Sequence, residues 1–370
     1  MEIEKCNVLY IVNADTPMAI ALEVAGKISR LPSINLKTVL FQEENKQTSK
    51  YVDVSVCSTG TKSFFDLRGI KNLWQLTAQF QPEVVHVHHT ASSFWGAILA
   101  KLVVGAAVVR TEHNNQRHYS IPQNIIHWCS QVLADRVLCN SEDTYRNLYP
   151  LQKCVIGDRW EVIYNGVNVS RIRDASSREF PLPAHILEDR FVVGSVGRLI
   201  DQKNYQRLIR AFPLVLDEIP EAHLVLIGGG KNRSELEEEA IAQDVEHHVT
   251  FAGKLVREDV YAVLHRFDLF VMPSLWEGFC NAVVEAMAAG LPVVCSDIST
   301  LREVVGDVGH YADPENPEAI ARSIVQVIRK GPEDWKREGE SARSHATKKY
   351  SIEKTAKSYI EVYKQVGKKL

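Results

Sequence analysis

The sequence predicts an α/β protein built from two doubly wound domains, each with a parallel sheet covered by helices. The 370 residues exceed what one ordinary hydrophobic core accommodates, so about two domains are expected. Short apolar runs of strand length alternate with stretches of helical periodicity, which is typical of parallel sheets with crossover helices. This alternation stops at a polar segment near the middle of the chain and then starts again.

The first domain is predicted to span residues 1–170. The segment Ala19–Leu31, between its first two apolar runs, has the spacing of a helix. The predicted strands are Val8–Val12, Thr38–Phe41, Val84–His88 and Ala107–Thr111. In an open parallel sheet, ligands bind beyond the carboxyl ends of the strands, so the residues that follow each strand are the candidates for function.

A linker and a second domain follow. Residues 171–190 are polar, include two prolines and fit neither the helical nor the strand period, so they are expected to form a hinge. The second domain is predicted over residues 191–350. Its predicted strands are Phe191–Val196, His223–Ile227, Val249–Ala252, Leu269–Met272 and Val293–Cys295.

The last segment, residues 351–370, has the pattern of a helix with one apolar face. The residues on that face are Ile352, Ala356, Tyr359, Ile360 and Tyr363. A helix of this kind needs a partner surface, so it is expected to pack against a core.

Composition and charge argue against several classes of protein. The net charge of -3 gives no nucleic-acid footprint, and the 7 cysteines show no Cys-x-x-Cys spacing typical of a zinc site. The amino terminus lacks the basic start and apolar middle of a signal peptide. The longest apolar stretch, Trp95–Val109, is interrupted by Lys101 and is too short to cross a bilayer. We therefore expect a cytoplasmic protein with at most a peripheral contact at the cytoplasmic face of a membrane.

The strongest chemical signal is the stretch 273–290, which follows a predicted strand and ends at a helix stop. Its helix is apolar nearly all round and carries one carboxylate, Glu285, whose burial would cost several kcal/mol without a polar partner. The adjacent hydroxyls of a sugar or ribose would be such a partner, and Glu277 lies in the loop just before the helix. The alternative is that Glu285 bridges polar groups inside the core.

Two cations follow the strand Phe191–Val196. Arg198 comes just after the strand and Lys203 opens the next helix, so both are expected at one strand end. Arginine grips phosphate oxygens in bidentate fashion and lysine acts as a point charge. The pair would therefore suit a pyrophosphate and the charge that grows on a departing nucleotide. The alternative is two solvated surface charges.

Histidines are concentrated at two strand ends of the first domain. His113 follows Ala107–Thr111, and its neutral imidazole would serve as a hydrogen-bond partner for a sugar hydroxyl; the alternative is a structural histidine. His86, His88 and His89 lie along and just after another strand. No carboxylate or cysteine spacing accompanies them, so no metal site is predicted.

Three consecutive glycines, Gly228, Gly229 and Gly230, follow the strand His223–Ile227. Their spacing does not fit a dinucleotide fingerprint. The next helix is expected to begin with Ser234, and its acidic first turn would repel a phosphate. The glycines are therefore interpreted as a tight turn.

Taken together, the motifs resemble the family-4 retaining glycosyltransferases with the GT-B fold, in which two Rossmann-like domains face each other across a cleft. The resemblance covers most of the chain and is specific because several segments match at once. They are Gln81–His88, Ala134–Val137, Asn140–Glu142, Ile163–Val167, Gly197–Asn204 and the Glu277 to Glu285 motif with its seven intervening residues.

The resemblance implies a nucleotide diphosphate sugar as donor, a glycan or lipid-linked acceptor, and no cofactor or bound metal. It also implies a final helix that crosses back onto the first domain. The donor residues implied are Arg198 and Lys203 for the pyrophosphate, Glu285 for the ribose, Glu277 with the backbone of Gly278, Phe279, Cys280 and Asn281 for the transferred sugar, and the main chain near Lys254 and Leu255 for the base. His113 would face the sugar from the other domain.

Two positions depart from the family pattern. Many members carry paired glycines in the first strand-to-helix loop, where this chain has Asn13–Pro17 with a carboxylate at Asp15. A carboxylate disfavours a nearby phosphate, so Asp15 is expected to contact the acceptor. Cys280 stands where glycine or another small residue is common. Its β-carbon limits positive φ, so the sugar loop is expected to differ somewhat in shape.

The acceptor side is expected near Gln116–Tyr119, where Arg117 would meet an anionic or lipid-linked acceptor. The helix that follows has a broad apolar face, interpreted either as core packing or as a surface that leans on a membrane. Two other functions stay open at this point: a nucleotide-sugar epimerase of the same architecture, and an inactive nucleotide-sugar-binding subunit.

Overall fold

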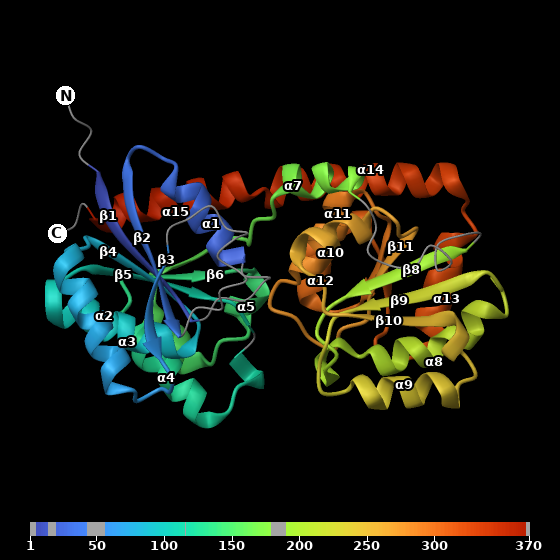
Figure 1. The fold of residues 1–370 in the computed structure, drawn as a ribbon, viewed down its shortest axis with the longest axis horizontal. Coiled ribbons are helices and arrows are strands. Elements are labelled where there is room, and N and C mark those ends of the chain that lie inside the picture. Colours follow the sequence, from blue (N-terminus) through green and yellow to red (C-terminus); the bar gives the residue numbers. More distant parts are fainter. Residues whose placement is uncertain (1–4, 14–19, 43–55, 115, 179–189, 368–370) are drawn as a thin grey trace. The chain divides into compact units, whose positions relative to one another are not determined.

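The computed structural model describes residues 5–13, 20–42, 56–114, 116–178 and 190–367. The chain forms two compact units (Figure 1). Unit 1 comprises residues 1–166 with 352–370, and unit 2 comprises residues 167–351. Each unit contains one parallel sheet with helices on both faces, so the predicted pair of doubly wound α/β domains is confirmed.

Unit 1 has a seven-stranded sheet in the order β3-β2-β1-β4-β5-β6-β7. Its strands are β1 Cys6–Val12, β2 Ile34–Gln42, β3 Val56–Thr61, β4 Val84–His88, β5 Ala107–Glu112, β6 Arg136–Cys139 and β7 Trp160–Val162. Its helices are α1 Ile20–Ser29, α2 Leu67–Phe80, α3 Thr90–Leu99, α4 Ile121–Leu133, α5 Glu142–Arg146, α6 Pro150–Ile156 and α15 Ile352–Gly367, with a π-helical turn at Ala100–Val104 and a 3₁₀ turn at Gln116–His118. The strand order reverses between β1 and β4, which makes the carboxyl ends of these two strands the expected ligand edge.

The final helix α15 belongs to unit 1, where it lies against α1 (Figure 1). Its apolar face is buried, and polar contacts accompany it: Thr355 Oγ1 donates to the carbonyl of Tyr164 at 2.9 Å. Tyr363 Oη lies 2.6 Å from Nδ1 of His86 in β4. The last helix therefore covers the sheet formed by the first residues of the chain.

Unit 2 has a six-stranded sheet in the order β10-β9-β8-β11-β12-β13. Its strands are β8 Phe191–Val196, β9 Ala222–Ile227, β10 Val249–Gly253, β11 Leu269–Met272, β12 Val293–Ser296 and β13 His310–Ala312. Its helices are α7 Val169–Asp174, α8 Tyr205–Leu216, α9 Arg233–Ala242, α10 Arg257–Leu264, α11 Asn281–Ala289, α12 Ser299–Val305, α13 Pro317–Ile328 and α14 Pro332–Tyr350, with 3₁₀ turns at Ala175–Ser177, Asp201–Lys203, Glu246–His248 and Gly306–Val308. Here the order reverses between β8 and β11.

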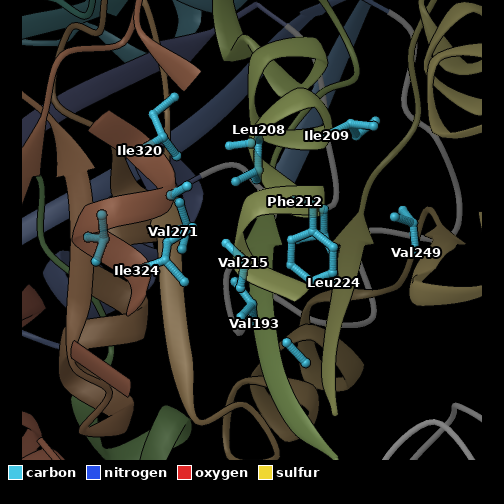
Figure 2. Close-up of a cluster of buried hydrophobic side chains, with 14 of the residues drawn as sticks. Val193, Leu208, Ile209, Phe212, Val215, Leu224, Val249, Val271, Ile320 and Ile324 are labelled. Carbon is cyan, nitrogen blue, oxygen red and sulfur yellow. The ribbon is translucent and has the colours of Figure 1, made fainter. Parts of the chain in front are cut away.

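Apolar side chains from both layers fill the core between the sheet of unit 2 and helices α8 and α13 (Figure 2). Phe212 of α8 is fully buried beside Leu224 of β9, and Ile324 of α13 packs near Val271 of β11. These strands are buried on both faces, which is why they appear in the sequence as continuous apolar runs.

The hinge predicted over residues 171–190 is wrong in its first part. Residues up to Asp174 form the end of α7, and Ala175–Ser177 forms a 3₁₀ turn. Asn168 caps α7 by accepting from the backbone N–H of Arg171 at 3.1 Å, and His265 Nε2 donates to the carbonyl of Ile172 at 2.7 Å. The cap is a local signal that sequence reasoning missed, whereas the contact with His265 is tertiary and is not visible from the sequence of this segment. Residues 179–189 lie outside the described part of the chain.

The three glycines after β9 lie where two backbone segments approach each other closely, and the turn follows them at Lys231 and Asn232. A β-carbon at Gly228 would lie 1.8 Å from the carbonyl oxygen of Gly197, and one at Gly230 would lie 2.2 Å from that of Leu199. The next helix begins two residues earlier than predicted, at Arg233, with Asn232 rather than Ser234 at the N-cap. The glycines therefore allow the loop after β9 to lie directly against the loop after β8.

Candidate active site

The predicted donor residues follow β8 and β11, the two strands of unit 2 at which the strand order reverses. The loop after β8 carries Arg198 and Lys203, and the loop after β11 carries Glu277. Because the carboxyl ends of neighbouring parallel strands share one edge of the sheet, both loops belong to the expected ligand edge.

A buried ion pair joins the two loops. Lys203 Nζ lies 2.5 Å from Glu277 Oε1, and Ser274 Oγ donates to the same oxygen at 2.6 Å. The exposed fractions of the two charged side chains are only 12% and 7%. Burial alone would lower the pKa of Lys203, but its neighbours Cys280 and Glu277 raise that pKa above the usual value, so the ammonium group stays charged. The sequence predicted both residues for the site; their contact with each other was not expected.

Arg198 differs from Lys203 in its surroundings. It is exposed, and among the residues that the structure describes it forms no ion pair. Gly197 beside it leaves room for the stem of Lys203, since a β-carbon at Gly197 would lie 3.1 Å from Lys203 Cε. The loop after β8 thus presents one cation held in a buried pair and one cation on the surface.

Glu285 lies on α11 and is almost fully buried, as expected, with an exposed fraction of 1%. Its Oε1 accepts from Arg257 Nη2 at 3.0 Å and from Tyr261 Oη at 3.3 Å. Sequence reasoning missed both partners, although they stand four residues apart on α10, just after β10. This contact is a bridge inside the core that does not test the ribose contact, and it means that Glu285→Ala would also leave Arg257 without its carboxylate.

The sugar loop corrects the expectation for Cys280. This residue adopts φ 69 and ψ 72, a left-handed conformation, at the position just before α11. The expected change of loop shape, based on a β-carbon avoiding positive φ, is therefore wrong: the chain accepts the strained conformation instead. Burial, followed by the charge of Glu277, raises the pKa of the Cys280 thiol to about 12, so the thiol is neutral at pH 7.

Cys280 provides a direct test of this backbone strain. Cys280→Gly should be more stable than Cys280→Ala by about 1–2 kcal/mol, because both remove the thiol and only alanine keeps the β-carbon. Chemical unfolding in urea measures the difference. Equal stabilities, or a more stable alanine variant, would show that no strain is stored here.

The remaining donor residues occupy the same edge of unit 2. Gly278 and Phe279 are buried, with the Phe279 ring 5.3 Å from that of Tyr350 in an edge-on arrangement, and Asn281 is half-buried at the first position of α11. Leu255 is half-buried in the loop between β10 and α10. Their contacts with sugar and base stay predictions.

His113 directly follows β5 in unit 1 and is half-buried. Its Nε2 lies 2.9 Å from Nδ1 of His88, and its ring stacks on that of His89 with centroids 5.1 Å apart. Burial, followed by the charge of His89, lowers the pKa of His113 to about 3, so the imidazole is neutral at pH 7. His86 lies deeper, between Tyr363 and Thr111. Within the described ranges, no three His, Cys, Asp or Glu side chains gather in a metal-ligating group.

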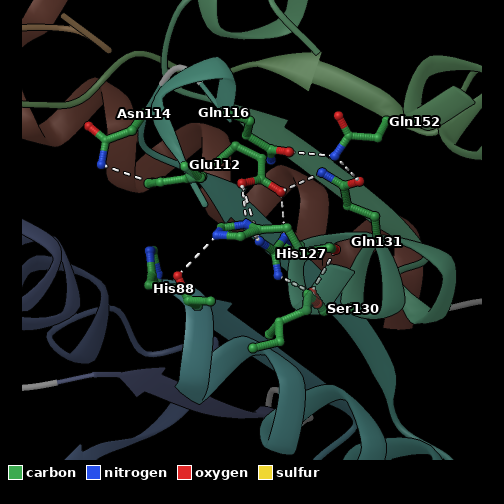
Figure 3. Close-up of polar contacts among 12 residues, drawn as sticks. His88, Glu112, Asn114, Gln116, His127, Ser130, Gln131 and Gln152 are labelled. Carbon is green, nitrogen blue, oxygen red and sulfur yellow. Dashed lines mark hydrogen bonds and ion pairs between the residues drawn. The ribbon is translucent and has the colours of Figure 1, made fainter. Parts of the chain in front are cut away.

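A buried polar network next to His113 was not predicted (Figure 3). Arg110 and Glu112 lie two residues apart on β5, so both point to one face, and Arg110 Nε lies 2.5 Å from Glu112 Oε1. From α4, Gln131 Nε2 donates to the same oxygen at 2.8 Å, and His127 and Ser130 contact Arg110. An arginine and a carboxylate inside an apolar-looking strand are the only signal in the sequence for this network.

Helix α4 buries its polar side chains and exposes much of its apolar face. Its buried residues are Asn124, His127, Ser130 and Gln131, and the last three face the network around Glu112 (Figure 3). Three of its apolar residues point outward, with Ile121 77%, Ile125 54% and Val132 56% exposed, whereas Leu133 packs against the core of unit 1. Core packing is therefore wrong for most of this face, because the buried ion pair on β5 requires polar partners from the opposite face.

Of the two acceptor-side residues, only one can be located. Arg117 is exposed in the 3₁₀ turn before α4. Asp15 lies outside the described residues. No helix in the parts of the chain that the structure describes is long and apolar enough to span a bilayer.

Comparison with known protein families identifies both halves of the chain. Residues 178–345 match the family described as Glycosyl transferases group 1, and residues 40–171 match Glycosyltransferase Family 4. An uncharacterized glycosyltransferase of Methanocaldococcus jannaschii is 31% identical over 300 residues, which cover 76% of this chain and 75% of that protein. The Escherichia coli UDP-Gal:alpha-D-GlcNAc-diphosphoundecaprenol alpha-1,3-galactosyltransferase is 26% identical over 301 residues and 73% of each chain.

Solved structures agree on the fold. The crystal structure of Anabaena Alr3699/HepE in complex with UDP and glucose matches with a TM-score of 0.81 at 18% identity, over 97% of this chain and 100% of that one. Sucrose-phosphate synthase from Thermosynechococcus elongatus matches with a TM-score of 0.82 at 20% identity, over 98% and 99% of the two chains. Together with the family matches, these similarities confirm the predicted GT-B fold and identify the chain as a member of the group 1, family 4 glycosyltransferases.

Proposed function

We propose that this glycosyltransferase moves a sugar, with retention, from a nucleotide diphosphate sugar to an acceptor hydroxyl without a bound metal. The observation that carries the proposal is the ligand edge of unit 2, where Arg198, the Lys203–Glu277 pair and Glu285 follow strands at which the strand order reverses. A similar chain, Anabaena Alr3699/HepE, has been crystallised with UDP and glucose, which supports a nucleotide donor.

Each donor group has a role that fits its surroundings. Arg198, exposed and without an ion pair among the described residues, binds the pyrophosphate in bidentate fashion, and Lys203 adds a fixed charge from its pair with Glu277. Glu285, oriented by Arg257, accepts hydrogen bonds from the ribose hydroxyls. Glu277 and the backbone from Gly278 to Asn281 hold the sugar, and the base lies near Leu255.

In the proposed reaction the acceptor hydroxyl attacks the anomeric carbon on the face from which the nucleotide leaves. The bond from that carbon to the phosphate oxygen breaks, the new bond to the acceptor oxygen forms, and the proton passes to the leaving phosphate. No enzymic nucleophile is needed. Arg198 and Lys203 stabilise the negative charge that develops on the leaving group, and His113 binds the sugar as a neutral imidazole.

Donor binding and metal independence can be tested together. A screen of nucleotide sugars by thermal shift should identify a donor that stabilises the protein by about 2.7 kcal/mol at 100 times its dissociation constant. Transfer from that donor should continue in excess chelator, because two cations already serve the pyrophosphate. Loss of transfer in chelator that magnesium or manganese restores would contradict the metal-independent reaction, and turnover of the donor without any acceptor would indicate an epimerase instead.

For the acceptor, we propose a lipid-linked glycan that the enzyme meets at the cytoplasmic face of a membrane. The outward apolar face of α4 supports this, with Arg117 in the turn just before it. The galactosyltransferase of Escherichia coli, to which the chain is similar, acts by its name on a sugar linked to diphosphoundecaprenol. Arg117 would pair with the phosphate of such an acceptor, and the side chains of α4 would enter the lipid interface.

The membrane contact predicts a specific defect. Ile125→Glu should weaken binding to phosphatidylglycerol vesicles roughly tenfold, because it replaces an exposed apolar side chain by a charge that anionic lipid repels. Ile241→Glu is the matched control, since Ile241 is 64% exposed on α9 of unit 2. Arg117→Ala should raise the acceptor Michaelis constant and leave donor affinity unchanged. If Ile125→Glu bound vesicles as tightly as the parent and Arg117→Ala kept the acceptor kinetics of the parent, this surface would be excluded as the acceptor and membrane contact.

A further inference from the structure

His113 is fixed by contacts on three sides. Asn140 Nδ2 donates to its main-chain carbonyl at 3.0 Å, the His89 ring stacks on its own ring, and its Nε2 is 2.9 Å from Nδ1 of His88. The other ring nitrogen of His113, Nδ1, has no hydrogen-bond partner among the residues described. Since His113 is half-buried, Nδ1 is the atom that remains for a ligand.

His88 contacts His113 from inside unit 1. It is fully buried at the end of β4, with its ring 4.3 Å from that of His86 and 4.6 Å from that of Tyr10. Burial holds the pKa of His88 well below its usual value, and the pKa of His113 is lowered as well. Each ring is therefore neutral at pH 7 and carries one N–H proton, so in the hydrogen bond between them one of the two facing nitrogens donates and the other accepts.

The second nitrogen of His88 decides the direction of this hydrogen bond. Nε2 of His88 is buried and has no partner among the described residues. If that nitrogen carried the proton, a buried N–H would be left without an acceptor, which is rare in folded proteins. If Nδ1 carries it, the proton is used in the contact with His113, and the atom left unpaired is an acceptor, which is less rare in protein interiors than an unpaired donor.

We propose that His88 is a positioning residue that donates its Nδ1–H to Nε2 of His113 and thereby holds His113 in the tautomer protonated at Nδ1. His113 then presents a hydrogen-bond donor, and not a base, to whatever lies beside it. The ligand group that this donor fits is an oxygen with a free lone pair, such as a sugar hydroxyl or a phosphate oxygen.

The kinetic consequence of this tautomer rests on the proposed function. A fixed N–H donor binds a sugar oxygen in one orientation but does not remove a proton from the acceptor hydroxyl. It therefore agrees with a reaction in which the leaving phosphate takes that proton. If His113 were free to exchange between its two tautomers, its Nδ1 would present a lone pair instead of an N–H part of the time. The sugar oxygen would then lose the hydrogen bond that orients it.

The tautomer can be measured directly in the parent protein. Histidines labelled with nitrogen-15 give separate long-range correlation patterns for the two neutral tautomers, and His113→Gln identifies the signals of His113. We expect protonation at Nδ1 for His113 and for His88 at pH 7.5. Protonation of His113 at Nε2 would overturn the proposal. This measurement needs neither a substrate nor activity.

Two variants of His88 test the positioning role. His88→Asn keeps an N–H donor close to the position of Nδ1, because the amide nitrogen of asparagine is also bonded to Cγ. His88→Leu has a similar volume but no donor. We expect His88→Leu to lower kcat at least about tenfold with donor affinity within about twofold of the parent, and His88→Asn to recover most of the loss.

The outcomes separate this inference from the proposed function. A purely structural role would lower the melting temperature of both variants without rescue of kcat by asparagine, and that result would overturn the positioning role. Parental kcat in His88→Leu would do the same. If the parent transferred no sugar from any nucleotide donor, the proposed function would fail, while the tautomer measured in the parent would still confirm or overturn the hydrogen-bond direction.

Discussion

Replacing Lys203 with methionine should abolish sugar transfer and also lower the free energy of unfolding by about 3–5 kcal/mol. The second effect arises because Glu277 is nearly buried and would lose the ammonium group that lies 2.5 Å from its carboxylate. Urea unfolding and a sugar-transfer assay on the same variant measure the two losses. Parental stability in Lys203→Met would contradict the buried ion pair.

Arg198→Ala is the matched control for Lys203→Met, since both residues are proposed to hold the pyrophosphate. Arg198 is exposed and makes no ion pair within the described residues, so its loss should weaken donor binding and leave stability unchanged. The double variant Lys203→Met with Glu277→Gln should recover most of the stability and none of the transfer. Recovery of both would mean that the pair has only a structural role.

The second large effect is expected in the acid stability of unit 1. Burial lowers the pKa values of His86, His88 and His127 below the ordinary value of 6.5. In the unfolded chain these histidines bind a proton near pH 6.5, whereas in the folded chain they stay neutral to lower pH. Their contribution to stability is therefore complete above about pH 6.5 and is lost as the pH falls below it.

Each such histidine should reduce the free energy of unfolding by up to about 1.4 kcal/mol per pH unit below pH 6.5. Urea unfolding at pH 7.5, 6.5 and 5.5 measures this slope. His86→Gln should make the slope of unfolding free energy against pH shallower by the contribution of one histidine, whatever its effect on stability at neutral pH. His247→Gln, whose side chain is 90% exposed, should leave the slope unchanged. Equal slopes in the parent and His86→Gln would contradict a neutral buried His86.

Several features were determined by the sequence alone because they depend on periodicity and on order along the chain. The apolar runs predicted the strands around Val84–His88 and Phe191–Val196, since strands buried on both faces tolerate few polar residues. The position of Arg198, Lys203 and Glu277 after strands was enough to predict one ligand edge, because parallel strands end at the same side of a sheet.

Contacts between side chains distant in the sequence were decided only by the tertiary structure. Arg257 is the partner of Glu285, 28 positions away, and nothing near Glu285 in the sequence indicates it. Likewise the polar face of α4 is the buried one because Arg110 and Glu112 on β5 require polar partners, so the apolar face is the exposed one. A pattern of apolar residues defines a helix face, but the surface it packs against determines which face is inside.

Backbone conformation was also decided in part by the tertiary structure. Composition predicted a hinge from residue 171, but Asn168 and the contact of His265 with Ile172 stabilise a helix there. The β-carbon of Cys280 predicted an altered loop, but burial of the loop holds the residue at positive φ. Local preferences in both places amount to about 1–2 kcal/mol, and tertiary contacts of similar or greater energy override them. The sequence by itself therefore determined most of the strands and which charged residues follow them, but it missed β3, β6, β7 and β13. The tertiary structure decided which charges pair, which helix face is buried and which backbone strain is tolerated.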